Sequence, residues 1–348
     1  MNYFIKNIAL DSQFEDYNLF DEGDYKEKVL QNLSKINILV GANNSGKSRF
    51  MRFLTQPEQY KFTPNIEFQA INETKEKIAT TIKQFADNRQ LANIEGLLWA
   101  RNLKGYDLID ERTEYKEEVN SILNKIFNSR ALAVTKGNIT GNDEHSTTAL
   151  QKELSGYKKE FEFLYESIPD KFSFKKLYIP ALRGLRTLSN DNDDFYKART
   201  LKDYFPGKSF KPDIFTGLDL YEKIKNLLLG NLEERKSVKE FEIFLSETFF
   251  EKKPVALIPR KDSDVLYVKI GVEDERPIHE LGDGIQSIIT LVFPLFELQG
   301  EALLVFIEEP EIYMHPGLQR VFMDTLLKFD NHQFFFHNTF KSLPGSHA

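Results

Sequence analysis

The stretch "INILVGANNSGKS", Ile36 to Ser48, decides the fold of this 348-residue chain. It opens with a short apolar run that ends at Gly41, which predicts a strand that ends in a turn. A helix is expected to follow from Gly46 through Leu54. A strand, a glycine-bounded loop and a helix in direct succession predict an α/β fold.

Within this stretch, Gly41 to Ser48 match the phosphate-loop pattern GxxxxGK[ST]. Glycines let backbone N–H groups close around phosphate oxygens, with the positive end of the helix behind them. Lys47 is then expected to reach the β- and γ-phosphates of a nucleotide, and the Ser48 hydroxyl to ligate Mg²⁺. A turn with coincidental residues is the alternative, which the flanking strand and helix disfavour. The predicted nucleotide-binding residues of the loop are Gly41, Asn43, Asn44, Ser45, Gly46, Lys47 and Ser48.

A second signal is "LLVFIEEPE", Leu303 to Glu311, an apolar run that ends in two acids. In open α/β sheets, ligands bind at the carboxyl ends of the strands. Glu308 is therefore predicted to hold the Mg²⁺ shell, and Glu309 to orient or deprotonate the attacking water as a catalytic residue beside Lys47. Taken alone, two glutamates after a strand more often form a solvated strand end. The phosphate loop earlier in the chain favours the catalytic interpretation.

A third signal is "ELGDGIQS", Glu280 to Ser287, in which glycines flank the start of a helix. The free N–H groups at a helix N-terminus suit an anion. An ordinary helix cap, with Asp283 as the capping residue, explains the same pattern equally well. This motif alone does not decide between the two.

Together, "INILVGANNSGKS", "LGDGIQS" and "FIEEPEIYMHPGLQR" resemble the ABC-type ATPase heads of the SMC, RecF and OLD (overcoming-lysogenisation-defect) group. Within that group the chain is similar to compact bacterial ATPases found in phage-defence operons. The resemblance covers roughly residues 1–60 and 250–336. It implies ATP and Mg²⁺ as ligands, and a head-to-tail homodimer that sandwiches two nucleotides and controls a separately encoded effector or nuclease.

The resemblance also implies roles for individual residues. Gly284 and Ser287 are expected to face the γ-phosphate that the partner subunit holds. The further matches are Pro310 and Glu311 on the dimer-contacting loop, His315 and Pro316 at the end of that loop, and Arg183 or Arg186 near the site.

The chain departs from the group at its C-terminus. The resemblance implies a switch histidine in a "TTHS"-like stretch, which senses the γ-phosphate, whereas this sequence continues "QFFFHNTFKSLPGSHA". The codons that these residues permit allow "TTHS" to emerge one nucleotide out of frame. We therefore expect a frameshift that truncates the ATPase inside its switch motif, which the coding DNA can test. The alternative is a natural, divergent C-terminus in which His337 takes the place of the switch histidine. The position of His337 in the sequence, however, does not align with that histidine in the group.

The expected architecture is a P-loop nucleoside triphosphatase whose ABC-ATPase-like head combines residues 1–60 and 250–348. Residues 61–249 are expected to form a largely helical insertion lobe, because apolar residues recur at helix-like spacing from about Asn72 to Asn128. A strand-like return is predicted near residues 175–186, and a pair of strands around residues 261–264.

The overall composition describes an ordinary soluble globular chain, with 41% hydrophobic and 28% charged residues. A net charge of −7 disfavours a constitutive nucleic-acid coat, so DNA is a possible partner that the charge does not indicate. The absence of cysteine excludes disulfides, thiolate metal sites and cysteine nucleophiles. Because no segment has the apolar length of a signal peptide or a membrane span, we expect a cytoplasmic protein without a membrane partner.

Three functions remain open at this point. The first is a dimerising ATPase that acts through a partner effector in antiviral defence. The second is a nucleotide-binding module with little or no turnover, because the switch motif is truncated. The third is an SMC- or RecF-like DNA-associated ATPase, which the acidic charge and the short insertion disfavour.

Overall fold

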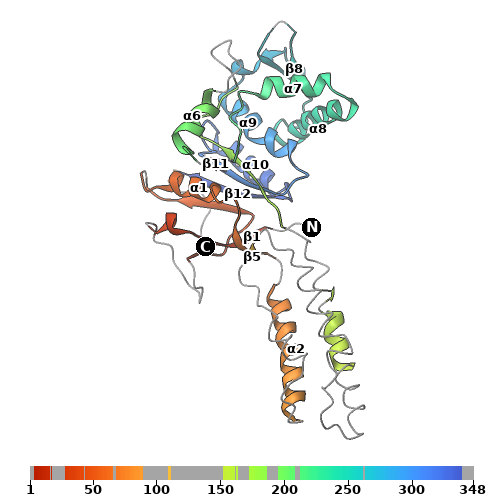
Figure 1. Ribbon diagram of the computed structural model, residues 1–348. Coiled ribbons are helices and arrows are strands. Elements are labelled where there is room, and N and C mark those ends of the chain that lie inside the picture. Colours follow the sequence, from red (N-terminus) through yellow and green to blue (C-terminus); the bar gives the residue numbers. More distant parts are fainter. Residues whose placement is uncertain are drawn as a thin grey trace.

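The computed structural model describes residues 4–15, 17, 28–42, 44–65, 68–88, 109–110, 152–160, 162–163, 172–185, 195–207, 212–261 and 263–338. This part of the chain forms three β-sheets with helices packed around them, and a helical arm that extends away from the sheets (Figure 1). Asn43, Arg186 and the tail from residue 339 onward, on which expectations from the sequence fall, lie outside the described residues.

A five-stranded parallel sheet forms the centre of the fold, in the order β3-β12-β11-β6-β7. In its register, Glu308 of β11 lies opposite His337 of β12, and His337 lies opposite Leu39 of β3. The carboxyl ends of three neighbouring strands therefore meet at one edge, where parallel sheets bind ligands. The strands are β3 (Ile36–Val40), β6 (Lys175–Ile179), β7 (Asp213–Ile214), β11 (Leu303–Glu308) and β12 (His332–Asn338).

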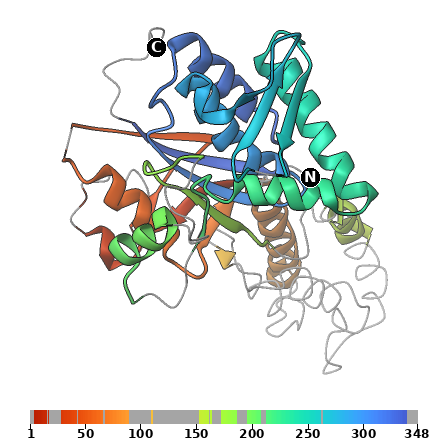
Figure 2. The same ribbon diagram turned by 90° about the horizontal axis from the view of Figure 1, so that it is seen from above.

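Both faces of the parallel sheet are covered, which explains why β11 and β12 are apolar without interruption. Alternate residues point to opposite faces. The helices that cover the sheet are α1 (Lys47–Thr55) on one face and α7 (Leu220–Leu229), α8 (Leu232–Phe249), α9 (Asp283–Glu297) and α10 (Pro316–Leu326) on the other (Figure 2). Leu304 and Phe306 pack with α1 and the N-terminal antiparallel sheet, whereas Val305 and Ile307 pack with the helices on the other face.

Two antiparallel sheets flank this centre. One has the order β2-β1-β4-β5 and the other β10-β9-β8. In the second sheet, β8 pairs with β9 across the turn around residues 261–264, so the strand pair expected there is confirmed. The strands of the two sheets are β1 (Ile5–Ala9), β2 (Val29–Leu30), β4 (Lys61–Pro64), β5 (Ile109–Asp110), β8 (Val255–Pro259), β9 (Leu266–Ile270) and β10 (Arg276–Pro277).

The helical arm consists of α2 (Phe68–Asn88) and, beside it, the helical residues 152–160 (Figure 1). Thr74 and Lys77 of α2 both contact the carboxylate of Glu160, and the side chains of Ile78 and Leu154 are completely buried. An apolar seam with polar flanks therefore holds the two segments together. None of the described helices is long and apolar enough to span a lipid bilayer.

The head takes in more of the chain than residues 1–60 and 250–348. Residues 172–249, which lie inside the range expected as a helical insertion, supply β6 and β7 of the parallel sheet and the helices α7 and α8 that cover it. The short helix α6 (Phe195–Tyr204) lies between β6 and β7 in the chain. The predicted return strand is β6, and its place beside β11 depends on pairing across more than a hundred residues, which local sequence patterns do not specify.

Candidate active site

The loop between β3 and α1 turns sharply at its last residue. Gly46, the N-cap of α1, has a φ of 88°, a left-handed conformation that glycine adopts without steric cost. A Cβ atom at this position would also lie 3.3 Å from the hydroxyl oxygen of Tyr17. Asn44, two residues earlier, has a φ of 63°. The backbone thus requires glycine at position 46 and aims the N-terminus of α1 at the loop.

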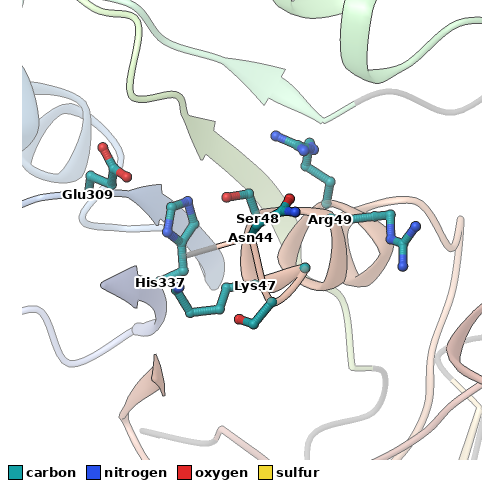
Figure 3. Close-up of a pocket in the computed structure, with 9 residues that line it drawn as sticks. Asn44, Lys47, Ser48, Arg49, Glu309 and His337 are labelled. Carbon is teal, nitrogen blue, oxygen red and sulfur yellow. The ribbon is translucent and has the colours of Figure 1, made fainter. Parts of the chain in front are cut away.

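A cavity of about 580 Å³ opens at this loop and is lined by residues from three parts of the chain (Figure 3). The loop and α1 form one side of it, while Glu309 after β11 and His337 of β12 form the other. The structure therefore brings Glu309 to the predicted phosphate loop. The lining residues are Asn44, Ser45, Gly46, Lys47, Ser48, Arg49, Arg52, Glu309 and His337.

Lys47 begins α1, and its ammonium group folds back over the loop. Nζ donates hydrogen bonds to the carbonyl oxygens of Gly41 and Ala42, at 2.7 and 2.8 Å. These two carbonyls hold the positive charge beside the free N–H groups at the start of the helix. A ligand that carries several negative charges is the natural occupant of such a place.

Glu308, the last residue of β11, is buried in a hydrogen-bond network. Its Oε1 accepts a bond of 2.9 Å from Nη1 of Arg52 and one of 2.5 Å from the hydroxyl of Tyr178, and Oε2 accepts one of 3.2 Å from the backbone N–H of Ala181. Nε2 of His337 lies 3.6 Å from Oε1. Glu308 does not itself line the cavity, but its neighbours Arg52 and His337 do.

The charges in this network depend on one another. Burial alone would raise the pKa of Glu308, but His337, Tyr178 and Arg52 together hold this pKa below its ordinary value. Burial and the adjacent Glu308 carboxylate raise the pKa of the Tyr178 hydroxyl well above its ordinary value. The tyrosine therefore stays a donor, and Glu308 stays an anion with Arg52 as its counter-ion.

Glu309 follows Glu308 but has different surroundings. Its φ of 44° is left-handed, which is uncommon for a residue other than glycine and costs strain. Arg183 donates hydrogen bonds to the carbonyl oxygens of Glu308 and Glu309, at 2.7 and 2.8 Å, and so holds the backbone of this turn in place. Burial lowers the pKa of Arg183 to about 10, and the guanidinium remains charged at neutral pH. Arg183, one of the two arginines expected near the site, therefore lies beside Glu308 and Glu309. It holds their backbone and does not line the cavity.

His337 is a site residue that the sequence offered only as an alternative. It is 2% exposed, lines the cavity, and within the described residues neither ring nitrogen has a hydrogen-bond partner. Its contact with Glu308 at 3.6 Å is too long for a hydrogen bond, so the buried ring is suited to bind a ligand that satisfies its nitrogens. Its position follows from the parallel register with β11 and β3, which the motif comparison could not supply.

The residues of the third motif lie elsewhere in the head. The hydroxyl of Ser287 on α9 is 3.4 Å from the carbonyl oxygen of Ile312, and a Cβ atom at Gly284 would lie 3.2 Å from the carbonyl oxygen of Tyr313. Both residues therefore pack against the segment that follows Glu309, and neither lines the cavity of its own chain. Their expected role in the site of a partner subunit stays a prediction.

The donors around the cavity fit Mg²⁺ only together with a phosphate ligand. Ser48 offers a hydroxyl, and Glu308 and Glu309 offer carboxylates. No group of three or more metal-ligating His, Cys, Asp or Glu side chains occurs in the described part of the chain. Mg²⁺ commonly uses one or two carboxylates and completes its shell with water and substrate phosphates, so this donor set suits it.

A parallel sheet with helices on both faces, a phosphate loop after one strand and an acid after another strand in the same cavity define a P-loop nucleoside triphosphatase. The chain belongs to the AAA ATPase domain family, whose model matches residues 23–336. At the level of that family, it is an ATP-binding ATPase domain.

Solved structures that resemble the chain include SMC heads. One is an SMC head bound to the C-winged helix domain of ScpA, with 15% identity, 36% of this chain and 47% of that chain covered, and a TM-score of 0.27. A second concerns ATP-driven dimerization and DNA-stimulated activation of SMC ATPases, with 13% identity, 36% and 71% coverage and a TM-score of 0.25. A third is the Smc head domain with an extended coiled coil from Pyrococcus furiosus, with 11% identity, 88% and 55% coverage and a TM-score of 0.24.

The chain spans about half the length of the first of these structures. No curated protein sequence matches it.

Proposed function

We propose that the chain is a Mg²⁺-dependent ATPase that dimerises around ATP and thereby controls a separate effector. One observation carries this proposal: the same cavity is lined by the phosphate loop and by Glu309. A triphosphate held by the loop therefore has a carboxylate on its other side, where a water could attack the terminal phosphate. That combination is what in-line hydrolysis requires.

In this proposal each residue has a separate task. Lys47 leaves the loop carbonyls and neutralises the β- and γ-phosphates, while the N–H groups of the loop cradle them. Ser48 and Glu308 hold Mg²⁺, which screens the phosphate charge when it is bound. Glu309 orients or deprotonates the attacking water. His337, whose ring nitrogens make no hydrogen bond within the described residues, donates to the γ-phosphate.

In the proposed dimer, each subunit adds the N-terminus of its α9 to the nucleotide site of the other. Gly282 and Asp283 are exposed at the N-terminus of α9, and neither lines the cavity of its own chain. In a head-to-tail dimer this helix end, with Gly284 and Ser287 behind it, faces the nucleotide of the partner subunit, where its free N–H groups stabilise the γ-phosphate. The effector and its role in anti-phage defence rest on the resemblance of the motifs to compact defence ATPases.

A nucleotide-binding module with little turnover is the second candidate, and the state of Glu308 favours it. Both oxygens of that carboxylate already accept hydrogen bonds, from Arg52, Tyr178 and Ala181. If these bonds persist when nucleotide binds, Mg²⁺ is held poorly and hydrolysis is slow. The two candidates predict the same nucleotide affinity and different rates of phosphate release.

One set of measurements tests both candidates. Lys47→Ala should weaken ATP binding at least about 100-fold, because several charge-assisted hydrogen bonds to phosphate are lost. Calorimetric titration with ATP measures this, and Lys269→Ala, which removes an exposed lysine of β9, is the matched control. Phosphate release by the unmodified chain then decides between ATPase and module. Tight ATP binding by Lys47→Ala would show that the site is elsewhere.

A further inference from the structure

Arg52 stands between the cavity and Glu308. Its guanidinium lines the cavity and donates to Oε1 of Glu308 at 2.9 Å, whereas Glu308 is not a lining residue. A cation that enters the cavity therefore reaches this carboxylate past the Arg52 guanidinium. The side chain of Glu308 is 5% exposed, so Arg52 is the full positive charge that balances it.

Arg52 and the predicted metal ligand Ser48 lie on the same face of α1. They are four residues apart, and residues at this spacing lie one above the other along a helix. A Mg²⁺ ion held between the hydroxyl of Ser48 and the carboxylate of Glu308 would lie close to the Arg52 guanidinium. Two cations so close repel each other strongly in a partly buried site.

We infer that Arg52 is a counter-ion that holds Glu308 until Mg²⁺ displaces it, and so sets the Mg²⁺ concentration at which the site fills. The inference rests on the proposed function, because it takes Glu308 as a ligand of the metal shell. Arg52 is thus a positioning residue that acts through Glu308. It keeps the buried carboxylate charged and ordered when no metal is bound.

A second contact gives Arg52 a place to remain when it releases Glu308. Its guanidinium carbon lies 4.0 Å from the centre of the Tyr204 ring, within the range of a cation–π interaction. Tyr204 is the last residue of α6 and is partly exposed. The ring compensates part of the lost ion pair, so displacement by Mg²⁺ does not leave the guanidinium without a partner.

The experiment measures binding of the non-hydrolysable ATP analogue AMP-PNP by calorimetry over a series of Mg²⁺ concentrations. In Arg52→Met, which keeps an unbranched side chain without charge, the half-saturating Mg²⁺ concentration should fall on the order of tenfold or more. Arg49→Met is the matched control, because Arg49 lines the same cavity from the same helix and donates to the hydroxyl of Tyr17. Its Mg²⁺ dependence should change far less.

Every other result of this titration would overturn the inference about Arg52. If folded Arg52→Met requires as much Mg²⁺ as the unmodified chain, or more, Arg52 does not compete with the metal and the inference is wrong, while the proposed function stands. If Arg52→Met does not fold, Arg52→Gln replaces it, since glutamine removes the charge and keeps a hydrogen-bond donor for Glu308. An unchanged or higher Mg²⁺ requirement in Arg52→Gln would overturn the inference. Failure of the unmodified chain to bind AMP-PNP at any Mg²⁺ concentration would overturn the proposed function as well.

Discussion

Glu308 and Glu309 are neighbours in the chain and have opposite environments. Glu308 ends β11 with its carboxylate buried among Arg52 and Tyr178, whereas Glu309 turns into the cavity on a left-handed backbone that Arg183 fixes. The alternation of side chains along a strand separates them, and the strained turn re-aims the second. Two identical residues can thus take different roles, one as the charge of the metal shell and the other beside the attacking water.

His332, at the start of β12, should make the stability of the protein depend on pH. It is 2% exposed, Nε2 donates to the carbonyl oxygen of Leu295 at 3.0 Å, and the ring stacks on Phe329. Burial lowers the pKa of His332 below its ordinary value of 6.5, so the folded state prefers neutral imidazole. Above pH 6.5 this contribution to stability is complete. As the pH falls below 6.5 the unfolded chain binds the proton first, and stability is lost.

Urea unfolding at about pH 7.5 and about pH 5 measures this effect. Other groups titrate in the same range, so the comparison is made between the unmodified chain and His332→Gln, whose amide can still donate to the Leu295 carbonyl. The free energy of unfolding should fall less between the two pH values in the variant. An equal fall in both proteins would mean that His332 does not contribute.

At the scale of elements, the sequence predicted what local patterns determine. The strand, loop and helix from Ile36 to Leu54 and the strand that ends at Glu308 appear as predicted, because glycine positions and apolar runs are local signals. Arg52 and His337 were not predicted as part of this site in their present roles. Arg52 looks like a solvated helix residue in the sequence, and only the packing of α1 on β11 and β12 brings it to Glu308.

Strand β3 lies at one edge of the parallel sheet and is open to pairing with another chain. Among the described strands it hydrogen-bonds only to β12, it carries no charged residue, and Val40 is 71% exposed. Unprotected edges of this kind pair with other chains, and a lysine on the edge prevents it. Val40→Lys should therefore lower self-association of the nucleotide-free protein, with little change in stability because the side chain is already exposed.

Static light scattering over a range of protein concentrations measures that association. Val272→Lys is the matched control, since Val272 is fully exposed in the turn after β9 and gains the same charge away from any sheet edge. If both variants reduce scattering equally, the cause is net charge and not the edge of β3.

At the scale of the whole molecule, the exposed start of α9 lies outside the cavity that collects the phosphate loop, Glu309 and His337. In the proposed head-to-tail dimer, the start of α9 in each chain contributes to the nucleotide site of the other. The helical arm of α2 and residues 152–160 extends away from the head (Figure 1).

Glu309→Gln should accumulate as a dimer in the presence of ATP and Mg²⁺, because the nucleotide is bound but no longer hydrolysed. Adding Gly282→Glu to this variant should abolish the dimer. A side chain at Gly282 meets no heavy atom within 4 Å in its own chain. A carboxylate there also stabilises the N-terminus of α9 by about 0.3–1 kcal/mol, so the monomer is not weakened. In the dimer, however, the same carboxylate would face the phosphates of the partner subunit and repel them.

Sedimentation velocity with and without ATP distinguishes monomer from dimer in these variants. Gly300→Glu in the Glu309→Gln background is the control, because Gly300 is equally open but follows the other end of α9. It should dimerise as Glu309→Gln does. Since Gly282→Glu adds the same charge in the same kind of open space, a difference between the two can only come from what approaches the start of α9. ATP-dependent dimers of the Gly282→Glu variant would exclude the head-to-tail arrangement.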